Sequence, residues 1–412
     1  MITVPEWHNA SVILDMNLEA GREDNVAICY GEEQVTYGEL ARRINRFGHA
    51  LKELSVGRED RVLLVLNDTP SFPPAFFAAM RIGAIPVPVN TLLEADDYRY
   101  FVENSLARTV LADQQHHEKI RDALDGLQEP VELILANGRE EGARLLEDLL
   151  EWGEDKLDPV ATHKDDAAFW LYSSGTTGKP KGVVHLHHDI DYTCETYARH
   201  VLEVNESDRC FSTTKLFHAY GFGGGLSFPY WAGASSVLLP GRPTPEAVLE
   251  TIQRYEPTLF FCVPTLYRSI LSYEEAEYYD LSSIRLCASA SEPLPADIWH
   301  RWKETFDLTI LDGIGSTEML HIFCSNTPEK VEPGSSGKPV PGYELRILDE
   351  EGYPLEAGNA GQLQVKGDSA LEYYWRNHEE TKETIKGEWL HAGDFYRLDE
   401  DGFYWYEGRA DD

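Results

Sequence analysis

The sequence predicts an α/β fold made of two helix-flanked, mainly parallel-stranded sheet subdomains and a small antiparallel, β-barrel-like subdomain. The chain has 412 residues, which is beyond the size at which one hydrophobic core stops growing, so several subdomains are expected. In two stretches, short apolar runs alternate with segments of helical periodicity, a pattern typical of parallel sheets covered by helices. Towards the end, glycine and proline turns separate short alternating runs, which favours antiparallel strands.

The first α/β subdomain is expected over residues 1–165. Its strand candidates are the apolar runs at 61–66, 85–90, 108–113 and 131–137, and helices are expected at 74–84 and 96–105. Pro86 and Pro88 predict that the second of these strands lies at a sheet edge, because proline cannot donate to the ladder. The polar, acidic residues 138–166 predict a surface connection with one short helix.

The pattern restarts in a second α/β subdomain, expected over residues 166–333. Its strand candidates are 167–173, 234–240, 258–264 and 284–290, with helices at 245–255 and 295–306. The β-rich subdomain is expected over residues 334–408, with strand candidates at 343–349, 361–367 and 402–408.

The charge balance excludes some classes of partner. The chain has 71 Asp and Glu against 36 Lys and Arg, a formal net charge of −35. Nucleic acids and anionic membranes both need a basic surface, so neither is an expected partner. The acids are dispersed along the chain, which fits either a halophilic source, where salt screens them, or a merely acidic protein.

Cysteines and apolar runs indicate the compartment. The six cysteines lie far apart without a C-x-x-C pair, mostly in apolar runs, so buried free thiols are expected. The N-terminus shows no signal-peptide pattern and no apolar run approaches membrane-spanning length. We therefore expect a cytoplasmic protein, either a monomer or a homodimer.

The most informative segment, residues 172–182, reads Tyr-Ser-Ser-Gly-Thr-Thr-Gly-Lys-Pro-Lys-Gly and follows an apolar strand candidate. Glycines let backbone N–H groups turn towards an anion, and hydroxyls and lysines add further donors, so polyphosphate is the expected ligand. A Walker A loop is excluded because Ser173 stands where that motif needs its first glycine and Pro180 follows the lysine. The alternative is an exposed surface loop.

The segment resembles the signature loop of the adenylate-forming superfamily: acyl-CoA and aryl-CoA ligases, firefly luciferase and peptide-synthetase adenylation domains. Further motifs of that superfamily are matched in the same order by residues 216–225, 289–295, 312–318, 389–394 and 406–412. Two of them, Gly-Ile-Gly-Ser-Thr-Glu-Met-Leu-His-Ile-Phe and His-Ala-Tyr-Gly-Phe-Gly, look most like benzoate-CoA and hydroxybenzoate-CoA ligases.

The resemblance implies a set of nucleotide-binding residues. The loop would bind the phosphates of ATP through Ser173, Ser174, Gly175 and Gly178, with Thr176, Thr177, Lys179 and Lys181 assisting the chemistry. Adenine and nearby contacts would come from Ser291, Glu292, Pro293, Asp312, Gly313, Ile314, Gly315, Ser316 and Thr317. Glu318 would hold Mg²⁺, and Asp394 and Arg409 would bind the ribose.

The residues themselves leave alternatives open. Glu318 follows what we expect to be a glycine-rich turn after a strand, so it can lie at the carboxyl end of a sheet, where ligands gather in α/β proteins. It could also be a solvated surface residue. Asp394 offers carboxylate acceptors for ribose hydroxyls but could cap a turn instead.

The resemblance also implies an aryl site. The ring would sit between Ala219, Tyr220 and Gly221 on one side and His321 and Ile322 on the other. His218, where the benzoate branch commonly has phenylalanine, would shape the pocket or take part in catalysis; a core histidine is the alternative. Residues 223–225, all glycine, are expected to loosen this loop. The sequence His-Leu-His-His-Asp at 185–189 is expected to be structural or gating, with zinc binding as its alternative.

The function implied is ATP-dependent activation of benzoate or a substituted benzoate to acyl-AMP, with pyrophosphate release and transfer to CoA as co-substrate. Alternatives are an aryl adenylation domain that loads a carrier protein, a synthetase for another small acid, and a non-catalytic nucleotide sensor. The resemblance further implies a hinge over residues 409–412, centred on Asp411, before a mobile C-terminal domain that this sequence does not contain. Thioester formation is therefore expected to be impaired.

Overall fold

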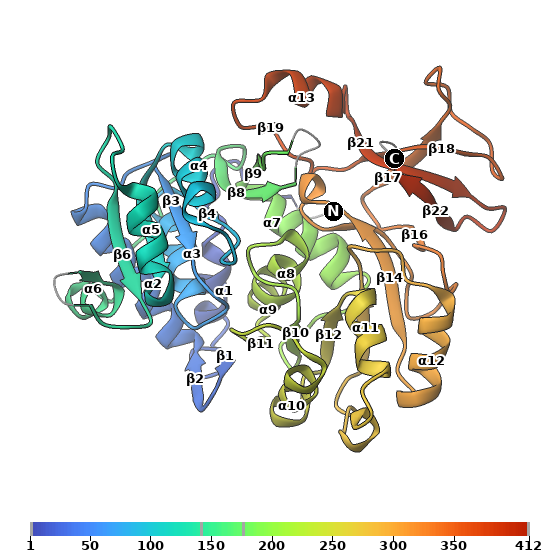
Figure 1. The fold of residues 1–412 in the computed structure, drawn as a ribbon, viewed down its shortest axis with the longest axis horizontal. Coiled ribbons are helices and arrows are strands. Elements are labelled where there is room, and N and C mark those ends of the chain that lie inside the picture. The colour runs from blue at the N-terminus through green and yellow to red at the C-terminus, as the bar shows by residue number, and fades with distance from the viewer. Residues whose placement is uncertain (1–2, 141–142, 175–177, 410–412) are drawn as a thin grey trace. The chain divides into compact units, whose positions relative to one another are not determined.

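The computed structural model describes residues 3–140, 143–174 and 178–409. The chain forms two compact units (Figure 1). The N-terminal unit contains Thr3–Asp191 and Leu238–Gly241, and the C-terminal unit contains Tyr192–Val237 and Arg242–Asp412. The finer subdomain boundaries expected from the sequence stay predictions.

The N-terminal unit is built around a parallel sheet with the strand order β4-β3-β5-β6-β7. The strands are β3 (Arg61–Val65), β4 (Ile85–Pro88), β5 (Ala107–Asp113), β6 (Glu132–Ala136) and β7 (Arg144–Leu145). The first four confirm the predicted strands, and β4, which carries both prolines, lies at the edge as expected. The connection after β6 forms the short strand β7 as well as the expected helix. The sequence did not predict β7, because two residues are too few to show a strand pattern.

Helices pack around this sheet (Figure 1). Helix α2 packs against α3 and α6, and α4 packs against α5. Their bounds, with the first helix of the unit, are α1 (Val12–Glu19), α2 (Tyr37–Glu53), α3 (Phe72–Arg81), α4 (Ala95–Ser105), α5 (His117–Leu124) and α6 (Leu146–Trp152). Every residue of α3 is buried, and proline is accommodated in its first turn, where the N–H group has no helical partner.

The remaining strands of this unit form antiparallel hairpins: β1 (Val26–Tyr30) with β2 (Glu33–Thr36), and β8 (Ala167–Ser173) with β9 (Lys181–Leu186). Strand β8 was expected, whereas β9 was not. A short 3₁₀ turn, η1 (Gln114–His116), precedes α5, and α7 (His187–Thr193) follows β9 directly.

In the C-terminal unit, strands run in the order β16-β15-β14-β13-β12-β10-β11. Neighbours from β11 to β14 pair in parallel, and β15 and β16 add antiparallel partners. The bounds are β10 (Arg209–Ser212), β11 (Ser235–Val237), β12 (Leu259–Cys262), β13 (Leu286–Ser289), β14 (Ile310–Gly315), β15 (Ile322–Ser325) and β16 (Lys338–Pro339). The mainly parallel arrangement confirms the predicted fold class.

The helices of this unit include two π-helical segments, η2 (Cys194–Arg199) and η3 (Gly223–Ser227). Their neighbours are α8 (Ala219–Phe222), α9 (Phe228–Ala232), α10 (Pro245–Tyr255), α11 (Pro264–Leu271) and α12 (Ala296–Phe306), with 3₁₀ turns η4 (Ala276–Tyr278) and η5 (Thr317–Met319). Such π segments are rare and are frequent at functional sites.

The β-rich part is antiparallel, as predicted. Strand β21 pairs with β18, β20 and β22, and β17 pairs with β18. The elements are β17 (Glu344–Leu348), β18 (Ala360–Lys366), β19 (Tyr373–Tyr374), α13 (His378–Thr384), β20 (Ile385–Lys386), β21 (Trp389–Leu398) and β22 (Tyr404–Arg409). They include all three strand candidates expected there.

Two expectations about the whole chain can be compared with the structure. All six cysteines are buried with free thiols, as predicted. Among the helices in the described ranges, none combines the length and the apolar character needed to cross a bilayer.

Candidate functional site

The predicted phosphate loop connects β8 to β9 in the N-terminal unit. Ser173 pairs with Lys181 and Tyr172 with Gly182, so the hairpin delivers both ends of the loop to one place. Gly178 has a φ of +89° and a Cβ there would meet nothing within 4 Å, so the loop is open at this point. Gly175, Thr176 and Thr177, which the sequence also assigns to this loop, lie outside the described residues.

Helix α4 supports the base of the loop, which the sequence did not indicate. The Tyr100 hydroxyl donates to the carbonyl of Pro180 (2.8 Å), and the Lys179 ammonium lies 4.8 Å from the centroid of the Tyr100 ring. The Tyr172 hydroxyl donates to Asn104 Oδ1 (2.7 Å). The loop therefore leaves the sheet from a fixed base, which limits the freedom of its lysines.

The histidines after the loop make internal contacts. His185 Nδ1 lies 2.7 Å from Asp189 Oδ2, and both side chains are fully buried. The backbone N–H of Ala10 donates to His187 Nδ1 (3.1 Å), and burial lowers the pKa of His187 to about 3. Within the described ranges, no group of three His, Cys, Asp or Glu side chains is arranged to hold a metal. These contacts favour the structural interpretation over the zinc interpretation.

In the C-terminal unit, the segment expected to be a glycine-rich turn is a strand. Strand β14 pairs in parallel with β13 through Asp312 and antiparallel with β15 from Gly313 onward. A Cβ on Gly315 would lie 2.6 Å from the carbonyl oxygen of His321, and one on Gly313 would lie 2.7 Å from that of Cys324. The glycines are therefore needed for close backbone approach, and the expectation of a turn was wrong.

The turn comes one step later, at η5, and carries Glu318. The Ser316 hydroxyl accepts a hydrogen bond from the Met319 N–H (3.2 Å), which closes this turn. The Tyr374 hydroxyl donates to Glu318 Oε1 (2.9 Å), and the Leu371 N–H donates to the Glu318 carbonyl (2.7 Å). Glu318 is thus half-buried and held at the end of β14, which disfavours the alternative of a solvated surface residue.

The Glu318 carboxylate suits a Mg²⁺ ion that takes its other ligands from a bound nucleotide and water. The carboxylate is a hard oxygen ligand, and the described residues offer no cluster of three metal-binding side chains around it. Mg²⁺ commonly binds through one or two carboxylates and takes its other ligands from substrate phosphates and water. Glu318 would therefore bind this ion together with a nucleotide.

The predicted adenine residues lie at the ends of neighbouring strands. Ser289, the last residue of β13, pairs with Asp312 of β14, and the exposed residues Ser291, Glu292 and Pro293 follow β13. Burial raises the pKa of Asp312 to about 8, against hydrogen bonds from Ser289 and the backbone of Leu294 and Gly313 that oppose the rise. These residues occupy the carboxyl edge of the parallel strands, where ligands gather in α/β folds.

Two of the predicted aryl residues, Tyr220 and His321, contact each other. Ala219, Tyr220 and Gly221 form most of α8 and are buried, and Ile322 begins β15. His321 Nε2 donates to the carbonyl of Tyr220 (3.3 Å). Its ring lies 5.4 Å from that of Tyr197, 5.6 Å from that of Tyr220 and 4.5 Å from that of Phe228.

The imidazole of His321 is neutral and presents an acceptor. Burial lowers its pKa to about 3. Because Nε2 carries the proton, Nδ1 is the acceptor, and in the part of the chain that the structure describes this buried atom has no hydrogen-bond partner. His218, in contrast, is exposed at the start of α8 with its ring 4.5 Å from that of Phe217, which disfavours the alternative of a core histidine.

The three glycines expected to loosen the loop do the opposite. Gly223, Gly224 and Gly225 are buried in η3. A Cβ on Gly224 would lie 2.6 Å from the Phe261 ring, and one on Gly225 would lie 2.7 Å from Leu216 Cδ2. The glycines make room for neighbouring side chains, so the expectation of a loose loop was wrong.

The predicted ribose residues face each other across two strands. Asp394 on β21 pairs in register with Arg409 on β22, and Arg409 Nη1 lies 3.4 Å from Asp394 Oδ1. Asp394 lies inside β21, so the alternative that it caps a turn was wrong. The pair offers carboxylate acceptors beside guanidinium donors, which suits a sugar diol. Asp411 lies outside the described residues.

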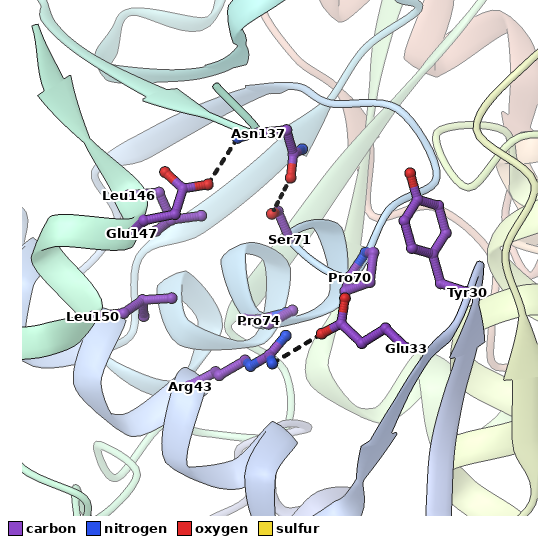
Figure 2. Close-up of a pocket in the computed structure, with 10 residues that line it drawn as sticks. All are labelled: Tyr30, Glu33, Arg43, Pro70, Ser71, Pro74, Asn137, Leu146, Glu147 and Leu150. Carbon is purple, nitrogen blue, oxygen red and sulfur yellow. Dashed lines mark hydrogen bonds and ion pairs between the residues drawn. The ribbon is translucent and has the colours of Figure 1, made fainter. Parts of the chain in front are cut away.

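The N-terminal unit also has a hollow of about 330 Å³, lined by residues of β1, β2, α2, α3 and α6 and of the loops before α3 and after β6 (Figure 2). Its polar lining groups bond to one another: Arg43 to Glu33 (3.0 Å), Ser71 Oγ to Asn137 Oδ1 (2.8 Å) and the Asn137 N–H to Glu147 Oε1 (2.8 Å). None of the predicted site residues lines it. We interpret this hollow as a gap between packed elements, because its polar groups pair with one another.

Comparison with known proteins agrees with the motifs. Residues 17–375 match the family described as AMP-binding enzyme. The chain is 44% identical to a benzoate-CoA ligase from Thauera aromatica, over 100% of this chain and 78% of that protein. It is 41% identical to a 4-hydroxybenzoate-CoA/benzoate-CoA ligase from Rhodopseudomonas palustris, over 98% of this chain and 75% of that protein.

A solved structure gives the same result for the fold. An anthranilate-CoA ligase in complex with anthranoyl-AMP superposes with a TM-score of 0.95 at 40% identity, and the match covers 99% of this chain and 79% of that one. Half-buried Glu318, the paired Asp394 and Arg409, and Gly178, where a Cβ would meet nothing within 4 Å, stand at the motif positions that the sequence singled out. The chain belongs to the AMP-binding enzyme family.

Proposed function

We propose that this protein activates benzoate or a substituted benzoate with ATP, releases pyrophosphate and passes the aryl group from acyl-AMP to CoA. The observation that carries the proposal is the hydrogen bond from the His321 ring to the Tyr220 carbonyl, because both residues belong to the predicted aryl site. Support also comes from the relatives, which act on benzoate, hydroxybenzoate and anthranilate by name. A buried, mostly aromatic site with few polar groups suits an aryl acid.

In the first step a carboxylate oxygen attacks the α-phosphorus of ATP. The bond from this phosphorus to the bridging oxygen breaks, a mixed anhydride forms, and pyrophosphate leaves. This chemistry needs positioning and neutralisation of negative charge more than proton transfer. Lys179, Lys181, Thr176 and Thr177 supply donors to the phosphates, and Glu318 would hold Mg²⁺, which neutralises charge on the departing pyrophosphate.

The ribose and base would be oriented by the C-terminal unit. The Asp394 carboxylate would accept hydrogen bonds from the ribose hydroxyls, with Arg409 donating beside it. The residues at the ends of β13 and β14, Asp312 among them, would lie along the adenine. In the second step the thiolate of CoA attacks the acyl carbon, and AMP leaves.

His321 indicates which kind of ring substituent the site prefers. Its Nδ1 atom is a buried acceptor that finds no partner among the residues the structure describes. A buried acceptor that stays unpaired costs about 1–3 kcal/mol, so a substituent that donates a hydrogen bond gains binding energy there. This favours a hydroxyl or amino group over an unsubstituted ring.

The test is ATP–pyrophosphate exchange with a panel of benzoate, hydroxybenzoates, aminobenzoates, cinnamates and short fatty acids. We expect exchange with aryl acids, fastest for a hydroxy- or aminobenzoate, and little with the fatty acids. Exchange with fatty acids alone would contradict the proposal and favour a synthetase for another small acid. Failure of every acid would favour a nucleotide sensor.

The acyl acceptor needs a separate experiment. Free CoA and a phosphopantetheinylated aryl carrier protein are offered side by side to the enzyme loaded with aryl-AMP. We expect aryl-CoA to form in preference to the carrier-protein thioester, at the reduced rate that impaired thioester formation implies. Transfer to the carrier protein alone would identify an adenylation domain instead.

A further inference from the structure

We propose that Tyr374 is a positioning residue for the Glu318 carboxylate, acting from a strap formed by residues 369–374, in which Ser369, Leu371 and Tyr374 are buried. The inference rests on the proposed function, because Glu318 matters there as the ligand of the divalent cation. Tyr374 would not touch the substrate. Its role is to fix the orientation of the carboxylate group that does the binding.

The strap holds η5 by three hydrogen bonds, donated by Ser369, Leu371 and Tyr374. The Ser369 hydroxyl donates to the Met319 carbonyl (2.9 Å), and the Leu371 N–H donates to the Glu318 carbonyl (2.7 Å). The Tyr374 hydroxyl donates to Glu318 Oε1 (2.9 Å). Two of these contacts fix the backbone of the turn, and the third fixes the end of its glutamate side chain.

The strap is itself anchored, so it can act as a reference for the turn. Ser369 is fully buried and its hydroxyl lies 2.7 Å from that of Tyr343. Leu371 is 2% exposed. A hydrogen bond fixes a flexible acceptor side chain at a lower entropic cost when its donor is already held in place, because only one of the two side chains then loses conformational freedom.

Tyr374 is ordered from both sides. Its side chain is buried at 5% exposure, and its backbone N–H donates to Thr381 Oγ1 (3.0 Å). The Thr381 hydroxyl donates in turn to the Asn377 carbonyl (2.8 Å), at the start of α13. The first turn of α13 therefore sets the position from which the phenol reaches Glu318.

The expected effect follows from the chemistry of metal sites. A carboxylate ligand has two oxygens and several rotamers, and a donor on one oxygen selects the plane and direction in which the group binds a cation. Removal of such an outer partner typically weakens metal binding or activity by about 10- to 100-fold. We expect the lower end of this range, because the two backbone contacts of the strap remain.

The experiment compares the wild-type chain with Tyr374→Phe, which keeps the ring and removes the hydroxyl. Binding of Mn²⁺ to the protein in the presence of ATP is measured by electron paramagnetic resonance, and the Mg²⁺ dependence of ATP–pyrophosphate exchange is measured alongside. We expect the half-saturating concentration of either cation to rise by about 10-fold. The KM for the aryl acid should stay unchanged.

Two further variants make the test decisive. Tyr353→Phe removes a hydroxyl from a tyrosine that is 69% exposed in the same β-rich part, and it should leave both measurements unchanged. In a cycle with Glu318→Gln, the effect of Tyr374→Phe on cation binding should disappear, since the carboxylate it positions is gone. Equal effects in both backgrounds would overturn the proposal.

A purely structural role gives a different result. Tyr374→Phe would then lower thermal stability and the maximal rate while leaving the cation dependence at the wild-type value, and that outcome also overturns the proposal. The Mn²⁺ measurement needs no aryl acid. Failure of the substrate panel would therefore count against the proposed substrate and leave the result for Tyr374 intact.

Discussion

Gly223 lies against the imidazole of His321 so closely that a Cβ at position 223 would stand 2.2 Å from the His321 Cδ2 atom. The glycine is part of the π-helical segment η3, and the histidine precedes β15. The two elements can approach only because one of them has no side chain. The position of the proposed aryl-site histidine therefore depends on a residue that contributes no chemical group.

Gly223→Ala should displace the His321 ring and weaken binding of the aryl acid. Overpacking in a core typically costs about 1–3 kcal/mol, and if half of this cost arises only when the acid is bound, the KM for the acid should rise by about 2- to 12-fold. The KM for ATP should change little. Gly241→Ala is the control, because a Cβ there would meet nothing within 4 Å; equal effects of the two variants would contradict the prediction.

Asp394→Asn should weaken nucleotide binding selectively. A hydrogen bond to a charged group contributes about 1.5–3 kcal/mol, so we expect the KM for ATP to rise by about 10- to 100-fold. The KM for the aryl acid should stay close to the wild-type value. Glu407→Gln is the matched control: it removes a carboxylate from β22 that forms an exposed ion pair with Arg397 (2.9 Å), and such pairs contribute little.

Asp312 should make the folded state less stable as the pH rises. Its pKa is 3.8 for an ordinary aspartate and about 8 in the fold, so between these values the unfolded chain loses a proton that the folded chain keeps. The penalty is absent below about pH 4 and complete above about pH 8. In urea unfolding, Asp312→Asn should gain stability relative to wild type across this window; a difference that does not depend on pH would refute the assignment.

His187 should contribute to acid sensitivity in the opposite direction. Its pKa is lowered from 6.5 to about 3 in the fold, so its contribution to stability is complete above pH 6.5 and is lost as the pH falls towards 3. His187→Asn keeps an acceptor for the Ala10 N–H and cannot be protonated, so its unfolding free energy should fall less steeply in acid. His187→Ala should instead be destabilised by about 1–3 kcal/mol near neutral pH, because the buried N–H loses its partner, and this deficit relative to wild type should shrink as the pH falls towards 3.

Local patterns in the sequence predicted most of the fold. Apolar runs identified β3, β5 and β6, and the prolines of β4 identified a sheet edge, because each of these signals depends on a residue and its immediate neighbours. Local patterns gave a wrong prediction at Gly313 and Gly315, where the glycines suggested a turn and the chain forms strand β14. Glycine marks both turns and places where two backbones approach, and only the pairing of β14 with β15 distinguishes the two.

The site was predicted less completely than the fold. The motif positions singled out Glu318, Asp394 and Arg409, whose residue types suit nucleotide binding. The supporting residues Tyr100 and Tyr374 could not be found in this way. They act across 80 and 56 residues of chain respectively, and no periodicity or short motif records a contact at that separation.

Strand β14 pairs with a parallel neighbour up to Asp312 and with an antiparallel neighbour from Gly313 onward. The two pairings together fix the position of each residue along this motif. The parallel half holds the buried carboxyl of Asp312 in one sheet register, and the antiparallel half holds the segment leading to Glu318 in another. An inserted residue between them would advance the chain by about 3.3 Å and turn each following side chain to the other face. A change in the length of this segment would therefore shift Glu318 relative to Asp312, whereas a substitution at a position other than the tightly packed Gly313 and Gly315 would keep their spacing.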